Sequence, residues 1–192
     1  AADVSWGTSL FRFVKEGHVT QDAHNATILA DNPFWRYSAS VYRKDNCADF
    51  LLRAQNNLKL DINVLLFIGW LAQQKKLFIV TPQHSTLITG FQKDITERIR
   101  YLRIKGKGFN SSEFYKALLD LELHAEYHQQ ARLVSLKELM PNVDLNIQDI
   151  IRKGVYNYIQ FEQGLKELSI DEQKLNQREL GELRLGIFEE DN

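Results

Sequence analysis

A segment that is apolar on every side constrains the fold of this chain more than any other feature. Between Asp61 and Gln73 the only polar side chain is that of Asn63. A helix that is apolar all round must be buried by other helices or by lipid. This segment is shorter than the roughly 20 apolar residues that a bilayer-spanning helix needs, and two glutamines and two lysines follow it. We therefore expect residues 61–76 to form the central helix of a soluble helical domain.

The rest of the sequence predicts an all-α fold. The chain has only three prolines and ten glycines in 192 residues, and its apolar residues recur at helical spacing. We expect an irregular bundle of six to seven helices around the central one, with Trp35, Cys47 and Trp70 in the core. The expected helices cover residues 33–43, 45–57, 61–76, 82–104, 111–140, 144–168 and 171–185.

Two of these helices are long, and a Lys-Gly-Lys-Gly turn at residues 105–108 separates them. Their apolar side chains follow steps of three or four residues, which is typical of a helix with one buried face. The positions that we expect to face inward are Leu87, Ile88, Phe91, Ile95, Ile99 and Leu102 in the first helix and Phe114, Leu118, Leu121, Ala125, His128, Leu133 and Leu136 in the second.

Composition divides the chain into an arm (1–31), a helical core (32–168) and an acidic helix and tail (169–192), frayed from Gly186. The formal net charge of −1 provides no overall attraction to nucleic acid or anionic lipid. The single cysteine excludes an intramolecular disulfide and fits a reducing compartment, so we expect a cytoplasmic protein without a membrane span.

Several short blocks resemble an uncharacterised family of gammaproteobacterial helical proteins, over roughly residues 33–165. The resemblance implies an all-α fold and a bacterial source, and it implies no activity. The chain departs from the family pattern in its N-terminal arm and its acidic C-terminal extension. The blocks that carry the resemblance are Phe34-Trp35, Tyr42, Cys47, Leu52 with Gln55, Asp61-x-Asn63-x-Leu65-Leu66-Phe67-x-x-Trp70-Leu71-Ala72, Ile99-Arg100-Tyr101-Leu102-Arg103 and Glu122-Leu123-His124-Ala125-Glu126.

A basic segment covers residues 93–107, with six basic and two acidic side chains and a net charge of +4. Basic residues that alternate with aromatics beside glycines can follow a phosphate backbone. The alternatives are a solvated helix face, or a partner for the acidic residues 162–192, which carry nine acids and four bases. The candidate nucleic-acid contacts are Lys93, Arg98, Arg100, Arg103, Lys105 and Lys107.

One cluster has side chains of the kind that bind metals: Glu122, His124, Glu126 and His128. The two histidines are one helical turn apart, and so are the two glutamates, but the pairs are offset by two residues. All four therefore cannot face one ion, and we expect a mixed polar face with no bound metal, His124 and His128 being the weak candidates.

The arm contributes apolar side chains outside the expected bundle, namely Trp6, Phe11 and Phe13. An isolated tryptophan there either docks the arm onto the core or anchors a protein partner or a second subunit.

No phosphate-binding loop, nucleophile elbow or dinucleotide fingerprint is present, so we expect neither an enzyme nor a cofactor. Our leading hypothesis is a helical protein that acts through protein contacts, in a regulatory role or as a homo-oligomer. The first alternative is a DNA-binding regulator that uses residues 93–107. The second is a metal or small-molecule site near residues 122–128.

Overall fold

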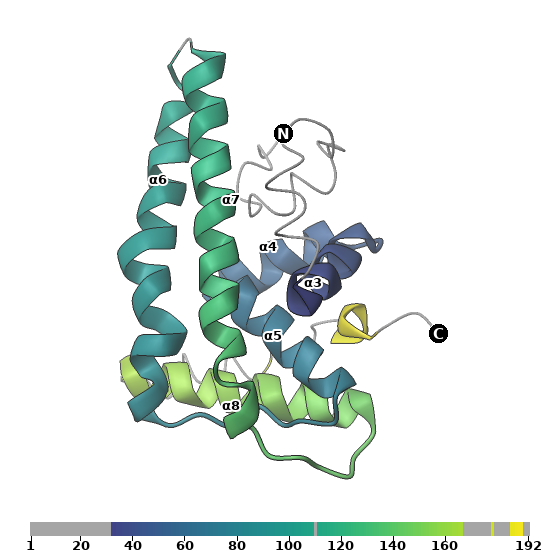
Figure 1. Ribbon diagram of the computed structural model, residues 1–192. Coiled ribbons are helices and arrows are strands. Elements are labelled where there is room, and N and C mark those ends of the chain that lie inside the picture. The colour runs from purple at the N-terminus through teal and green to yellow at the C-terminus, as the bar shows by residue number, and fades with distance from the viewer. Residues whose placement is uncertain (1–31, 110, 167–177, 179–184, 190–192) are drawn as a thin grey trace.

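The computed structural model describes residues 32–109, 111–166, 178 and 185–189. In these ranges it contains six α-helices and no β-strand, packed into a bundle (Figure 1), so the predicted all-α class is confirmed. No helix in the same ranges is both long enough and apolar enough to cross a bilayer. The helices are α3 (Pro33–Arg43), α4 (Cys47–Asn57), α5 (Ile62–Gln73), α6 (Glu97–Gly106), α7 (Ser112–Val134) and α8 (Ile147–Lys166).

The predicted central helix is α5, and every residue from 62 to 72 is buried. The side chain of Asp61 caps it by accepting a hydrogen bond from the backbone N–H of Val64 at 3.1 Å. Helices α3, α4, α7 and α8 all contact α5 (Figure 1). The helix ends at Gln73, short of residue 76, and Lys75 just beyond it has a left-handed backbone with φ of 57°.

Aromatic side chains fill the space between α3 and α5. The ring of Phe34 stacks on Trp70 with centroids 5.2 Å apart and meets Phe67 edge to face at 5.6 Å. Trp35 and Cys47 are also buried, as predicted for core residues. Helices α3, α4 and α5 pack closely on one another around these large rings. We call these three helices the body.

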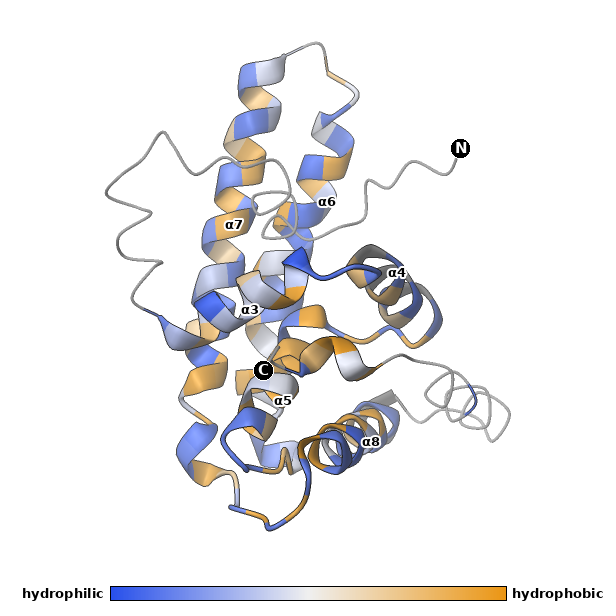
Figure 2. Cartoon of the chain, turned by 90° about the vertical axis from the view of Figure 1, so that its right-hand side faces the viewer, coloured by the Kyte–Doolittle hydropathy of each residue, from blue (hydrophilic) through white to orange (hydrophobic). Residues whose placement is uncertain are grey.

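Helices α6 and α7 are antiparallel neighbours that project beyond α3, α4 and α5, while α8 crosses the opposite end (Figures 1 and 2). The helical run that leads into α6 starts at Pro82. It passes through a 3-10 turn, η1 (Pro82–His84), and two π-helical segments, η2 (Thr86–Gly90) and η3 (Gln92–Thr96). The single long helix that we predicted here is therefore locally wider before it becomes α-helical.

The projecting pair differs from the body in polarity. Figure 2 shows hydrophobic residues concentrated in α5, whereas hydrophilic and hydrophobic residues alternate along α6 and α7 up to their far end. The inward positions predicted for these helices are wrong in part, because five of them are exposed: Ile95, Leu102, Phe114, Leu121 and His128. Among the described elements, each of these helices has only the other as a neighbour near the far end of the pair.

The chain's acidic end also differs from expectation. The segment η5 (Leu185–Phe188) is a 3-10 turn that packs on the body, so the prediction of fraying from Gly186 is wrong for this part. The ring of Phe188 is buried against Phe50 with centroids 5.0 Å apart, and its carbonyl accepts a hydrogen bond from Gln73 Nε2 at 2.8 Å.

We predict that Gly154→Ala in α8 destabilises the fold. A Cβ at this position would lie 2.7 Å from Ile68 Cγ2 on α5 and 3.4 Å from Phe78 Cβ, so extra volume must push the helices apart. We expect a loss of about 1–3 kcal/mol in the free energy of unfolding, measured by urea titration. Gly164→Ala is the matched control in the same helix, because a Cβ built there meets no atom of another described element within 4 Å. Equal stability of the two variants would contradict this packing.

Candidate functional site

The projecting hairpin is built from a close helix contact and a short turn. A Cβ at Gly106 would lie 2.6 Å from Leu118 Cδ1, so the lack of a side chain at Gly106 lets Leu118 of α7 pack directly against α6 near the turn. After the turn, the Ser111 side chain accepts a hydrogen bond from the backbone N–H of Phe114 at 3.3 Å and starts α7.

Charged residues fill the contact between the two helices. Arg100 Nε donates to Glu122 Oε1 at 2.8 Å, and its Nη2 donates to Glu126 Oε1 at 3.0 Å. Arg103 Nε donates to the other Glu122 oxygen. The side chains of Arg103 and both glutamates are fully buried, and that of Arg100 is 16% exposed. We call these four residues the seam.

Arg100 is held in its ionised form by the carboxylates around it. Burial lowers the pKa of Arg100, but the carboxylates of Glu126, Glu122 and Asp61 outweigh this effect, so the pKa is raised above its ordinary value. Buried charges are tolerated when each has close partners of opposite sign. The glutamates are thus occupied by guanidinium groups and are not available as a general base or as a metal-binding pair.

An amide cluster continues the polar contact from α7 into the body. Gln130 Nε2 donates to Asn63 Oδ1 at 2.9 Å and to Ser38 Oγ at 3.1 Å. Asn63 Nδ2 donates in turn to Gln129 Oε1 at 3.3 Å. Asn63 therefore pairs with side chains of α7. The cluster joins α7 to α3 and α5.

Asp61 lies where this polar layer meets α8. Burial raises the pKa of its carboxyl, against the opposing effects of Arg100 and Gln129. Burial also raises the pKa of Tyr158, and the nearby charges of Asp61 and Glu162 raise it further. The Tyr158 oxygen accepts a hydrogen bond from the Asp61 backbone N–H at 3.2 Å.

Two buried polar atoms near the seam lack full hydrogen bonding in the described structure. Thr96 Oγ1, at the end of η3, has no hydrogen-bond partner. Gln129 Nε2 makes no well-formed hydrogen bond, although its side chain lies close enough to the Asp61 carboxyl to oppose the rise in that pKa. An unsatisfied buried group costs about 1–3 kcal/mol, so the polar layer is not optimised for stability alone.

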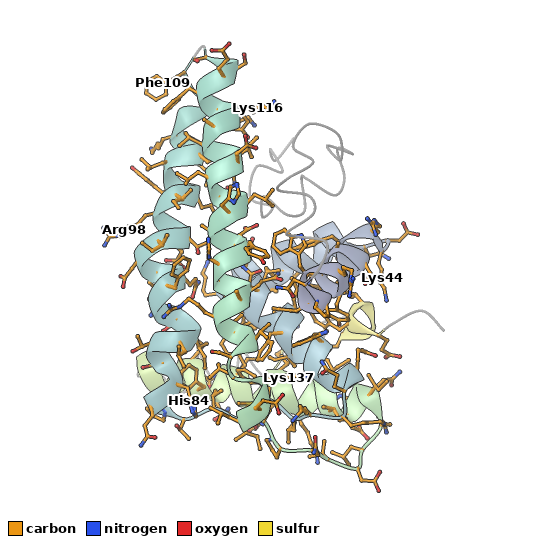
Figure 3. The ribbon with its side chains drawn as sticks, viewed as in Figure 1. Lys44, His84, Arg98, Phe109, Lys116 and Lys137 are labelled. Atoms are coloured by element: carbon orange, nitrogen blue, oxygen red, sulfur yellow. The ribbon has the colours of Figure 1, made fainter. Side chains whose placement is uncertain are left out.

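The outer side of the hairpin carries apolar side chains that no other described element covers. Leu102 is 52% exposed and Phe109 67%, while Phe114 and Leu121 on α7 are 50% and 49% exposed. The rings of Phe109 and Phe114 meet edge to face with centroids 6.3 Å apart. Figure 3 shows Phe109 at the far end of the hairpin. We call these four residues the tip face.

The six predicted nucleic-acid contacts divide into two groups. Lys93, Arg98, Lys105 and Lys107 are exposed, and Figure 3 shows Arg98 pointing away from α7. Arg100 and Arg103 belong to the seam, where glutamates balance their charges. The structure therefore does not bring the six cations together on one surface.

The residues of the weak metal candidate also separate. Glu122 and Glu126 are buried, whereas His124 and His128 are exposed on another side of α7, as the offset spacing predicted. Among the described residues there is no group of three or more His, Cys, Asp or Glu side chains that could hold a metal ion.

The remaining predictions concern the two ends of the chain. Trp6, Phe11 and Phe13 lie outside the described residues. Of the acidic tail, residues 185–189 lie on the body, where Lys44 Nζ donates to the Glu189 carbonyl, and not on the basic segment (Figure 1). Residues 167–177, 179–184 and 190–192, which would complete the acidic partner, also lie outside the described residues.

Sequence reasoning missed both the seam and the tip face. One signal was available: Arg100 and Arg103 share a helix side with Gly106, and Glu122 and Glu126 share one with Leu118. Charged residues beside the glycine that permits close packing indicate a buried ionic contact, which leaves the apolar residues of the same helices on the outside.

Comparison with known proteins gives one match. A family model described as a protein of unknown function (DUF2390) matches residues 33–133, more than half of the chain. This range includes the seam, the amide cluster and the tip face, and it ends before α8, short of the limit near residue 165 that the resemblance suggested. No curated protein and no solved structure matches the chain.

We predict that Glu122→Ala severely destabilises the protein. The substitution removes a carboxylate that both Arg100 and Arg103 contact, and it leaves buried positive charge poorly compensated. The expected loss is about 3–5 kcal/mol in the free energy of unfolding by chemical denaturation. Asp120→Ala, at an exposed position of the same helix, should change it by no more than about 0.5 kcal/mol. A small loss for Glu122→Ala would show that the seam is not a stabilising contact.

We also predict a pH dependence from Asp61. Because its pKa is raised in the folded state above the usual 3.8, the folded protein holds this proton more tightly than the unfolded chain. Its contribution to stability is therefore lost as the pH rises from about 3.8 through the raised pKa. Asn retains capping ability but does not titrate, so Asp61→Asn should become more stable relative to the wild type as the pH rises from 4 to about 7. A pH-independent difference in urea unfolding would refute the raised pKa.

Proposed function

Because this chain belongs to the DUF2390 family, whose function is unknown, we propose a function from its own geometry. We propose that the protein is non-enzymatic and acts through protein contacts, with the tip face as the docking surface. The observation that carries this proposal is the inverted polarity of the hairpin: the seam buries charge, while the tip face exposes four large apolar side chains.

Stability alone does not favour this arrangement. Replacing a buried ion-pair network with apolar residues of similar size is often neutral or stabilising. The half-exposed apolar side chains of the tip face gain only part of the free energy that full burial would give. An exposed apolar group rimmed by polar residues is typical of an interaction site. Aromatic side chains are enriched at the centres of such sites, and the tip face has two in contact, Phe109 and Phe114.

The part of the hairpin that contains the seam and the amide cluster holds the tip face in place, so the surface can be presented without rearrangement. The seam fixes the register of α6 against α7, and the amide cluster fixes α7 on α3 and α5. A surface that is already ordered pays less conformational entropy when a partner binds. The lack of catalytic motifs supports the non-enzymatic role, and the buried single cysteine supports a cytoplasmic location. The regulatory role stays a prediction.

The DNA-binding alternative also stays a prediction, carried by the exposed Lys93, Arg98, Lys105 and Lys107. Substitutions at Arg100 or Arg103 cannot test it, because they would disturb the seam.

We predict that substitutions in the tip face abolish partner binding and leave the fold intact. A photo-reactive amino acid placed at residue 102 should form covalent adducts with protein in the source cells, since a bound partner covers this side chain. The same group at residue 139 should not, although Leu139 is 62% exposed, because Leu139 lies outside the hairpin. Adding Phe109→Ser and Phe114→Ser should remove the adducts formed from residue 102. Equal labelling at both sites, or none at residue 102, would overturn the proposal.

A further inference from the structure

We infer that the partner of the tip face is the tip face of a second copy of this chain, so that two hairpins form a four-helix contact around a two-fold axis. The inference rests on the proposed function, because it names the occupant of the same surface. Three observations support it: the shared orientation of the apolar side chains, the register of the hairpin and the charges along its two edges.

The four apolar side chains line one side of the hairpin. Residues seven apart on an α-helix point in nearly the same direction, which relates Leu121 to Phe114. Phe109 packs on Phe114, and a Cβ at Gly106 would lie 3.4 Å from the Phe114 ring. Leu102 is one turn before Gly106 on α6. Both helices therefore contribute apolar side chains to the same face, near the end of the hairpin.

The register of the hairpin is known from its contacts. Arg103 lies level with Glu122, and Gly106 lies level with Leu118. Position 105 of α6 is consequently level with position 120 of α7. At 100° per residue, Lys105 and Asp120 point to the two outer edges of the hairpin, away from the seam. Both side chains are exposed.

The two edges differ in net charge near the end of the hairpin. The α6 edge carries Arg98 and Lys105, whereas the α7 edge carries two acids, Glu113 and Asp120, with Lys116 between them. Suppose that two tip faces meet around a two-fold axis parallel to the hairpins. Helix α6 of one copy then lies over α7 of the other, and position 105 of one copy stays at the same height along the axis as position 120 of the other. Lys105 of each copy then comes within reach of Asp120 of the other copy. An isologous contact needs this kind of self-complementary surface, apolar at its centre and opposite in charge at its paired edges.

The first experiment measures the mass of the full chain in solution. Light scattering after size-exclusion chromatography, from about 1 μM to about 1 mM, should show a monomer that becomes a dimer as the concentration rises. Leu102→Glu with Phe114→Glu should remain monomeric over this range, with an unchanged circular dichroism spectrum. Leu139→Glu, also at an exposed apolar position, should dimerise like the wild type.

The second experiment tests the pairing across the axis by charge reversal. Lys105→Glu and Asp120→Lys should each weaken dimerisation at least tenfold, because each places like charges opposite one another twice in the dimer. An equimolar mixture of the two variants should recover dimerisation, since both edge contacts of the mixed dimer again join opposite charges. A contact within one chain could not be restored by mixing, so recovery is specific to contacts between copies.

Two results would overturn the inference. One is a wild-type chain that stays monomeric at about 1 mM; the other is a dimer that persists in the Leu102→Glu, Phe114→Glu variant. If the wild type does not dimerise but adducts with another protein still form at residue 102, the dimer inference fails and the proposed function stands. If no adducts of any kind form, both the dimer inference and the proposed function fail.

Discussion

The buried ion pair between Arg103 and Glu122 determines how the rest of the hairpin is used. It occupies part of the contact in which α6 and α7 could otherwise bury apolar side chains against one another. Leu102 and Leu121, next to these charged residues in sequence, are therefore turned to the outside. Replacing one charged residue of the seam would leave its partner buried and unpaired, which costs several kcal/mol.

The polar layer continues into the body and makes the hairpin part of one structure. The amide cluster connects α7 to Asn63 on α5, and Asp61 connects the start of α5 to α8 through Tyr158. The central helix thus has two roles. Its apolar residues organise the core, and its first turn holds the polar residues that position α7. All of these residues except Tyr158 lie within the range that the family shares.

The sequence predicted the body of the fold better than the hairpin. The all-round apolar pattern of residues 62–72 could only be satisfied by burial, so the central helix followed directly. The hairpin could not be predicted in the same way, because a helical stripe of Phe114, Leu118 and Leu121 has the same spacing whether it faces a core or solvent. Only the partner charges across the seam decide the orientation, and they come from residues about 20 positions apart.

The central claim is that the tip face is covered when the protein works, and chemical labelling in intact source cells tests it most directly. Cysteine would be introduced at residue 121 or residue 139, both exposed in the described structure, while the native Cys47 is buried. A membrane-permeable maleimide should label both sites equally in dilute purified protein. In cells the account predicts at least tenfold slower labelling at residue 121 than at residue 139. Equal labelling of the two sites in cells would contradict it.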